Sequence, residues 1–168
     1  MVLIKVFREF NRRKVQYLVA GGVAAILYGN PRFTKDLDLF IDPDEENVQK
    51  MITAFKTLKF MPRIPVAPEA FISQENRTRW QREKGMLAFT FINPKNPFEN
   101  VDLLFSAPVS FEKAYKRRKI FKSGNVSIPT IAAEDLMFMK KQAGRPQDLQ
   151  DVEILKVAIR AQRNRKKK

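Results

Sequence analysis

The sequence contains no cysteine and no histidine among its 168 residues. Without cysteine there is no disulfide, no thiol nucleophile and no thiolate zinc site. Without histidine, the commonest general base and the commonest transition-metal ligand of proteins are also missing. Any catalysis must therefore rest on carboxylates, lysine, arginine, hydroxyl groups, backbone amides or a bound metal. With oxygen ligands alone, that metal would be a hard ion such as Mg²⁺ or Mn²⁺.

The sequence also lacks a long hydrophobic run. Its longest weakly polar stretch, residues 17–29, is shorter than the ~20 residues that a membrane-spanning helix needs, and it is interrupted by Gly21 and Gly22. The N-terminal residues alternate charged with apolar side chains, which is unlike the apolar centre of a signal peptide. We therefore expect a soluble, cytoplasmic protein with no membrane partner.

Acidic residues are few relative to basic ones, 18 against 32, so the net charge is +14. Many of the basic side chains are clustered, at Arg77, Arg79, Arg82 and Lys84, at residues 116–119 and at residues 163–168. This excess favours binding to a polyanion such as RNA or DNA. A solvated surface with a disordered tail explains the same charge equally well, because charge alone does not identify a partner.

Hydrophobic periodicity predicts a mixed α+β domain, and 168 residues are enough to bury a core. Helical spacing is expected at residues 2–13, at 23–28, in a helix that starts near residue 44 and includes 48–55, and in two C-terminal helices separated by Gly144 and Pro146. Strands are expected at residues 17–21, 36–42, 86–92 and 98–106, followed by a hairpin around Gly124 and Asn125.

Residues 61–84 have no clear period. Three prolines, Pro62, Pro65 and Pro68, favour a loop or an edge strand there. The segment also contains Trp80 among arginines. That ring could stack on a base, but we interpret it first as a packing residue.

The segment TKDLDLFID, residues 34–42, places two carboxylates on one face of a strand. Read with period two, Asp36 and Asp38 lie opposite Leu37, Leu39 and Ile41. A D-x-D triplet is common by chance, so the pair alone is weak evidence for a site. A half-solvated strand and a cation site both explain it.

A third carboxylate, Asp102, occurs in the later strand FENVDLLFS. It lies opposite Val101, Leu103 and Phe105, in a largely apolar strand where an unpaired charge is costly. Three carboxylates on adjacent strands repel one another unless a cation neutralises them. This repulsion is the physical argument for a divalent metal.

Two further features accompany the aspartates. Gly21 and Gly22 stand between a strand and a helix, where glycine lets the backbone approach a ligand and the helix start offers free amides to an anion. Arg32 offers a forked donor suited to phosphate, and Thr34 offers a hydroxyl group. Taken singly, these residues are equally explained as a tight turn, a surface arginine and a threonine at the entry to a strand.

The segment YLVAGGVAAILYGNPRFTKDLDLFI, residues 17–41, resembles with Asp102 the signature of the nucleotidyltransferase superfamily that has a DNA polymerase beta-type palm. The segment AAEDLMFMKKQAGRPQDLQDVEIL, residues 132–155, resembles the C-terminal helices of the abortive-infection toxin-type and related minimal nucleotidyltransferases. In those helices a lysine precedes an R-x-x-D-x-x-D pattern. Residues 60–85 have no counterpart in this resemblance. One departure is Gly22, which stands where many members have serine.

The resemblance implies a mixed β-sheet palm with flanking helices over residues 1–130. A C-terminal helical pair over residues 131–162 would pack on the palm as part of a single compact unit. Residues 163–168 would then form a basic tail.

The resemblance also implies an enzyme that moves a nucleoside monophosphate from an NTP such as ATP to an acceptor. Asp36 and Asp38 would bind two Mg²⁺ or Mn²⁺ ions. Asp102 would complete the site of the ion that polarises the acceptor hydroxyl, as a metal ligand and a candidate base. Such a reaction needs positioning and charge neutralisation rather than covalent chemistry.

Further residues receive roles from the same resemblance. Gly21 and Gly22 would hold the β and γ phosphates, with Arg32 and Thr34 nearby. Lys140 would reach the triphosphate, or would equally be part of a solvated helix face. The remaining charged residues of the C-terminal motif would orient the helix pair or touch substrate, and we favour the structural role for both aspartates; these residues are Arg145, Asp148 and Asp151.

The acceptor is open between an RNA end, a protein side chain and a small molecule. The basic clusters favour RNA, and tRNA in particular, and the toxin-type resemblance suggests an antitoxin partner. The competing hypothesis is a non-enzymatic nucleic-acid-binding module on a degenerate palm. The intact set of Asp36, Asp38 and Asp102 argues against it.

Overall fold

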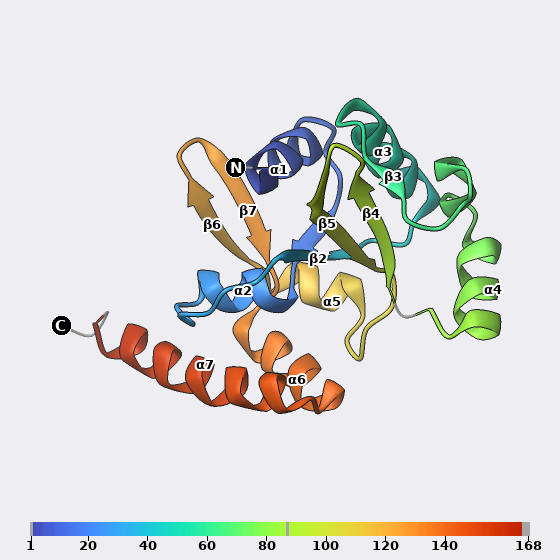
Figure 1. The fold of residues 1–168 in the computed structure, drawn as a ribbon. Coiled ribbons are helices and arrows are strands. Elements are labelled where there is room, and N and C mark those ends of the chain that lie inside the picture. Colours follow the sequence, from blue (N-terminus) through green and yellow to red (C-terminus); the bar gives the residue numbers. More distant parts are fainter. Residues whose placement is uncertain (1, 87, 166–168) are drawn as a thin grey trace.

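The computed structural model describes residues 2–86 and 88–165, and Figure 1 shows a central sheet between two groups of helices. The helices are α1 (Val2–Arg12), α2 (Gly21–Leu27), α3 (Glu45–Thr57), α4 (Gln74–Lys84), α5 (Phe111–Lys116), α6 (Ala133–Ala143) and α7 (Pro146–Arg165), with a short 3-10 helix, η1 (Pro68–Phe71). The strands are β1 (Tyr17–Val19), β2 (Asp36–Ile41), β3 (Met61–Pro62), β4 (Phe89–Asn93), β5 (Asn96–Leu104), β6 (Lys119–Ser123) and β7 (Val126–Thr130).

The sheet is mixed and has the strand order β3-β4-β5-β2-β1-β7-β6. At its centre, β2 runs parallel to β5 and antiparallel to β1, while β1 runs parallel to β7. The two strands that carry the aspartates are therefore direct neighbours in the middle of the sheet. This mixed sheet with flanking helices and a C-terminal helical pair confirms the predicted α+β fold.

The two faces of the sheet differ in chemistry. The face toward α1 and α3 is apolar, and aromatic rings continue the core from the helices to the sheet, with Phe10 against Phe55 and Phe55 stacked on Phe91. The opposite face is covered in part by α2, α5 and α6 (Figure 1). Here Phe40 packs against Phe111 of α5. The apolar core thus continues onto the second face around Phe40 and Phe111, and Asp36 and Asp38 lie on this second face further toward the start of β2.

The three prolines of residues 61–84 favoured a loop or an edge strand, and the polar run after them had no clear period, so its helix was missed. β3 is an edge strand, as expected, but Gln74–Lys84 form a helix. Only Arg77 and Trp80 are buried in it, so it has no apolar stripe for periodicity to reveal. Its signals are the ends: the Ser73 side chain caps the start, and Gly85 ends the helix with φ +60°.

The environment of Trp80 confirms its interpretation as a packing residue. Its ring is buried between Phe71 of η1 and Phe89 of β4. The buried Arg77 donates to the carbonyl groups of Phe71, Ile72 and Pro43. These bonds attach α4 to η1 and to the loop before α3. The segment is therefore built into the core of the domain at the β3–β4 edge.

The C-terminal helix is longer than expected. α7 continues to Arg165, so residues 163–165 of the predicted tail are helical, and residues 166–168 lie outside the described residues. Within residues 2–86 and 88–165, no helix combines the length and the apolar character needed to cross a membrane.

Candidate active site

The three predicted carboxylates lie on the same face of two paired strands. In the parallel register of β2 and β5, Asp38 is the partner of Asp102, and Asp36 is the partner of Asn100. Paired residues on neighbouring strands are about 4.8 Å apart and direct their side chains to the same side. The face is the one opposite the buried Leu37 and Leu39. The structure therefore places the three acidic residues on one face of two neighbouring strands, as their alternation suggested.

Asp102 is oriented by a residue that sequence reasoning missed. Thr90 of β4 pairs with Asp102 in the antiparallel register, and its hydroxyl donates to Asp102 Oδ1 at 2.6 Å. Thr90 alternates with the buried Phe89 and Phe91, so its parity along the strand was the available signal. The strand pairing needed to place it opposite Asp102 is not contained in that pattern.

The other two carboxylates have weaker contacts. Asp38 Oδ2 accepts a hydrogen bond from the Gly22 amide at 3.4 Å, and Asp36 Oδ1 accepts one from Asn100 Nδ2 at 3.5 Å. The Oδ1 atom of Asn100 is buried and has no hydrogen-bond partner in the described part of the chain. The sequence places Asn100 on the same strand face as Asp102, but its pairing with Asp36 was missed. The negative charge on β2 is thus poorly compensated by hydrogen bonds.

The pKa of Asp38 records this electrostatic situation. Burial of the carboxyl, followed by the negative charge of Asp102 and then that of Asp36, raises its pKa to about 6. The Gly22 amide and the positive charge of Lys140 act in the opposite direction but do not compensate. A carboxylate in this environment is stabilised by additional positive charge.

A hard divalent cation fits this donor set in chemical terms. The set offers oxygen atoms only, and a bound cation would relieve the repulsion that raises the pKa of Asp38. Across residues 2–86 and 88–165, no three acidic side chains are gathered tightly enough to form a ready-made ion site. In this structure Asp102 is instead hydrogen-bonded to Thr90, and Asp38 to the Gly22 amide.

The glycine turn lies directly against Asp38. Gly21 has φ +56°, and a Cβ atom there would overlap the Asp38 carboxylate, so only glycine fits. Ala20, the N-cap of α2, makes no side-chain cap. The start of α2 therefore lacks an N-cap side chain, although the Gly22 amide donates to Asp38 Oδ2 at 3.4 Å. Backbone amides at a helix start are the groups that bind anions.

Thr34 fills the space over the second glycine. A Cβ atom on Gly22 would lie 2.7 Å from Thr34 Oγ1 and 2.9 Å from Thr34 Cβ. Thr34 Oγ1 also donates to the Asp36 carbonyl at 3.4 Å. A serine at position 22, the residue common in the resembling proteins, would have to displace Thr34. Where many of the resembling proteins have the serine hydroxyl at position 22, this chain has glycine, and the hydroxyl group of Thr34 occupies that space.

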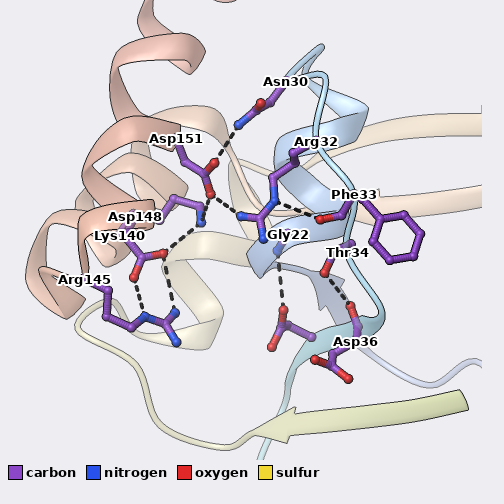
Figure 2. Close-up of polar contacts among 11 residues, drawn as sticks. Gly22, Asn30, Arg32, Phe33, Thr34, Asp36, Lys140, Arg145, Asp148 and Asp151 are labelled. Carbon is purple, nitrogen blue, oxygen red and sulfur yellow. Dashed lines mark hydrogen bonds and ion pairs between the residues drawn. The ribbon is translucent and has the colours of Figure 1, made fainter. Parts of the chain in front are cut away.

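Lys140 is buried, with 5% of its surface exposed, so its interpretation as part of a solvated helix face was wrong. Its ammonium group donates to Asp148 Oδ1 at 3.1 Å and to Asp151 Oδ2 at 2.7 Å, both on α7 (Figure 2). The helix pair explains the burial, because α7 packs over the face of α6 that carries this lysine. Lys141, the next residue, is exposed.

Asp151 connects the helix pair to the loop that precedes β2. It accepts hydrogen bonds from Asn30 Nδ2 at 2.8 Å and from Arg32 Nη1 at 2.5 Å, as well as the bond from Lys140 (Figure 2). Arg32 is therefore directed at α7 in this structure, whereas Thr34 lies over the glycine turn. Asn30 was not singled out from the sequence, where nothing but its position next to Pro31 distinguished it.

Asp148 and Asp151 are also buried carboxylates, but their pKa values are shifted in the opposite direction to that of Asp38. Burial alone would raise the pKa of both, but hydrogen bonds from Arg145 and Lys140 to Asp148, and from Lys140 to Asp151, outweigh it and lower both pKa values. Arg145 Nε lies 2.5 Å from Asp148 Oδ2. The two aspartates orient the basic residues of the helix pair, which agrees with the structural role favoured for them.

Comparison with known proteins identifies both a family and a fold. Residues 8–161 match the family described as nucleotidyl transferase AbiEii toxin, type IV TA system. No curated protein sequence matches the chain. Among solved structures, the chain resembles the lincosamide antibiotic adenylyltransferase LnuA bound to lincomycin, with 16% identity, coverage of 92% of this chain and 94% of that chain, and a TM-score of 0.59.

Two further solved structures are similar. One is ANT(2'')-Ia in complex with adenylyl-2''-tobramycin, at 12% identity, with 98% of this chain and 96% of that chain covered and a TM-score of 0.56. The other is an antigenic nucleotidyltransferase-like protein from Paracoccidioides brasiliensis, at 17% identity, with 92% and 73% covered and a TM-score of 0.53. At these identities the likeness establishes the fold, and the residue roles must be argued from this chain.

Proposed function

The chain belongs to the AbiEii family of nucleotidyltransferase toxins of type IV toxin–antitoxin systems, and we propose that it transfers a nucleoside monophosphate from an NTP to RNA in the cytoplasm. The observation that supports this site assignment is the pairing of Asp38 with Asp102 directly beneath the Gly21 turn. That arrangement places like charges side by side where a backbone can approach a phosphate.

The acidic residues would hold the metal. We assign Asp36 and Asp38 as ligands of two Mg²⁺ ions, and Asp102 as a further ligand of one of them. All of these donors are oxygen atoms, which Mg²⁺ prefers. Bound divalent cations would neutralise the carboxylates and the triphosphate and polarise the acceptor hydroxyl. Asp102 Oδ2, the oxygen that Thr90 does not engage, takes the proton of that hydroxyl.

The glycine turn and the basic residues would position the triphosphate. The amides of Gly21 and Gly22 and the hydroxyl of Thr34 face the β and γ phosphates, and Arg32 and Lys140 add positive charge behind them. The acceptor oxygen then bonds to the α phosphorus as the bond from the α phosphorus to the bridging oxygen breaks, and pyrophosphate leaves. Positioning and charge neutralisation account for such a transfer.

RNA is the acceptor class that the charge supports best. The net charge of +14 exceeds what a small acceptor requires. A polyanion such as RNA can contact basic side chains with many phosphates along its length. A small-molecule acceptor is the second candidate, because two proteins with this fold are described with lincomycin and with adenylyl-2''-tobramycin. Because the family is one of toxins of toxin–antitoxin systems, we also expect an antitoxin partner.

The test of the reaction incubates the protein with Mg²⁺, total RNA and each α-labelled NTP in turn, with parallel reactions containing lincomycin or tobramycin. We expect label in RNA with the wild type and none with Asp38→Asn. Glu112→Gln is the matched control, since it removes one exposed carboxylate charge on α5 and should leave transfer unchanged. Label only in a small molecule would replace RNA as the acceptor.

A second measurement tests the metal assignment without turnover. Mg²⁺ should raise the Tm of the wild type and of Glu112→Gln, and should raise the Tm of Asp38→Asn much less, because binding to the native state stabilises it. Equal shifts in all three proteins would remove Asp38 from the metal site. RNA binding that persists without any transfer would support the non-enzymatic alternative.

A further inference from the structure

An aromatic side chain projects from the loop that approaches the site. Phe33 stands between Arg32 and Thr34 and has 78% of its surface exposed, although it is apolar. Figure 2 shows its ring directed away from the Arg32–Asp151 ion pair and outward from the loop. Within residues 2–86 and 88–165, no other aromatic ring packs against it. The next residue, Thr34, donates its hydroxyl to the carbonyl of Asp36 on β2 at 3.4 Å.

The loop around this ring is anchored at both ends. Before it, Asn30 is buried and donates to Asp151, and Arg32 makes its ion pair with the same carboxylate. After it, Thr34 packs over Gly22. The backbone is also tied down, with the amide of Arg32 donating to the carbonyl of Asn30 at 2.9 Å. Phe33 is thus displayed at a fixed place rather than at the tip of a free loop.

We propose that the Phe33 ring stacks on a nucleobase, which belongs either to the NTP or to the RNA acceptor. This inference rests on the proposed function, because it places phosphates at Gly21, Gly22 and Thr34, and every nucleotide carries its base one sugar away from its phosphate. Stacking on an aromatic ring accepts any base and removes the exposed apolar surface of both partners from water.

The first test uses steady-state kinetics. Phe33→Ala should raise KM for one substrate by about 5- to 150-fold, the range expected for loss of one base–aromatic stack. A rise in KM for the NTP assigns the base to the nucleotide, and a rise in KM for RNA assigns it to the acceptor. Phe33→Tyr should retain the wild-type KM, whereas Phe33→Leu, apolar but without a ring, should behave like Phe33→Ala.

The matched control is Phe138→Ala, which removes another exposed phenylalanine ring, 43% exposed, from α6. It should change neither KM, because its position two residues from Lys140 directs it to another side of the helix. Unchanged KM values in Phe33→Ala, or wild-type kinetics in Phe33→Leu, would overturn the proposal.

The second test measures binding without turnover. The sequence has a single tryptophan, the buried Trp80, so Phe33→Trp adds an exposed fluorophore at the position in question. Its emission should be quenched by an NTP or by a short single-stranded RNA and not by tripolyphosphate, which has no base. Quenching by tripolyphosphate alone, or by none of these, would overturn the proposal. Base-dependent quenching in a protein without transfer activity would instead refute the proposed function and retain the stacking site.

Discussion

The acidic group on β2 and β5 and the mixed-charge group on α6 and α7 are two sets of charges. The first is built around the half-buried Asp38 and Asp102, and the second around the buried Lys140, Asp148 and Asp151. In the first set, Asp38 has carboxylates as its charged neighbours on the sheet, and its pKa is raised to about 6. In the second set, Asp148 and Asp151 are each bonded to basic side chains, and their pKa values are lowered. Burial acts in the same direction in both sets, so the difference comes from the partners.

This comparison separates a group that is complete from one that requires an external cation. In the helix-pair group, Lys140, Arg145 and Arg32 outnumber the two carboxylates that they contact, so the group needs no external cation and contributes to stability and orientation. The strand group leaves repulsion between Asp38 and Asp102 unrelieved. Functional sites often carry such costs, because groups arranged for a ligand are not at their most stable without it. Mutations should therefore have opposite effects on stability in the two groups.

The largest effect is expected from removal of the central cation of the helix-pair group. Lys140→Met leaves Asp148 and Asp151 buried without their shared ammonium group, which should destabilise the fold by about 3–5 kcal/mol. Lys141→Met is the matched control, because the adjacent lysine is exposed, and it should change stability by less than about 0.5 kcal/mol. Urea unfolding of the two variants measures the difference. Similar midpoints would mean that the buried pairs contribute nothing.

The opposite sign is expected in the strand group. With metal chelated at pH 8, Asp38→Asn should increase the free energy of unfolding, by no more than about 3 kcal/mol given a pKa of about 6. Because the folded-state pKa is raised, the cost of the ionised carboxyl is absent below the unfolded value near pH 4 and is complete above about pH 6. The gain from Asp38→Asn should therefore disappear at pH 4.

Asp151→Asn sharpens this comparison at the same pH. It should lower the free energy of unfolding at pH 8, since the depressed pKa of Asp151 means that its ionised form stabilises the fold. That contribution persists down to the unfolded pKa near 4 and is lost as the pH falls through the folded value. If both variants were destabilised at pH 8, the distinction between the two groups would be wrong.

Arg32 connects the two groups, so its removal should affect both moderately. Arg32→Met takes one of three hydrogen-bond donors from Asp151 and should cost about 1.5–3 kcal/mol, the value for a bond to a charged group. If Arg32 also assists the triphosphate, KM for the NTP should rise in the same variant. Arg12→Met, which removes an exposed arginine from its pair with Glu9 on α1, is the control. A change in KM equal to that of the control would restrict Arg32 to its structural contact.

The sequence allowed much of the strand group to be predicted, because strand chemistry is local. Period-two alternation is enough to put Asp36 and Asp38 on the face away from the core and to give Asp102 the same parity. Which residues stand opposite them depends on register, which involves two distant segments. The pairing of Thr90 with Asp102 and that of Asn100 with Asp36 were therefore missed.

The helix-pair group could not be predicted in the same way. Lys140 and Lys141 are indistinguishable by type, and only the docking of α7 onto α6 decides which of them is buried. α4 was missed for a related reason: its packing uses Trp80 and the aliphatic stem and charge of Arg77, with no apolar stripe. Polar residues are the ones whose placement depends most on tertiary partners, and those partners are absent from a local pattern.

The smallest expected effect concerns the contact between the glycine turn and the loop that joins the two groups. Gly22→Ser should cost about 1–3 kcal/mol, because its Cβ would lie 2.7 Å from Thr34 Oγ1 and the site is already filled. In the double variant Gly22→Ser/Thr34→Ala, part of that cost should be recovered, giving a coupling energy of about 0.5–3 kcal/mol. The double variant also keeps one hydroxyl group over the turn, now from the other side. Additive effects in this cycle would show that Thr34 does not occupy the space that serine would take, and the hydroxyl of Thr34 would lose its assigned place beside the phosphates.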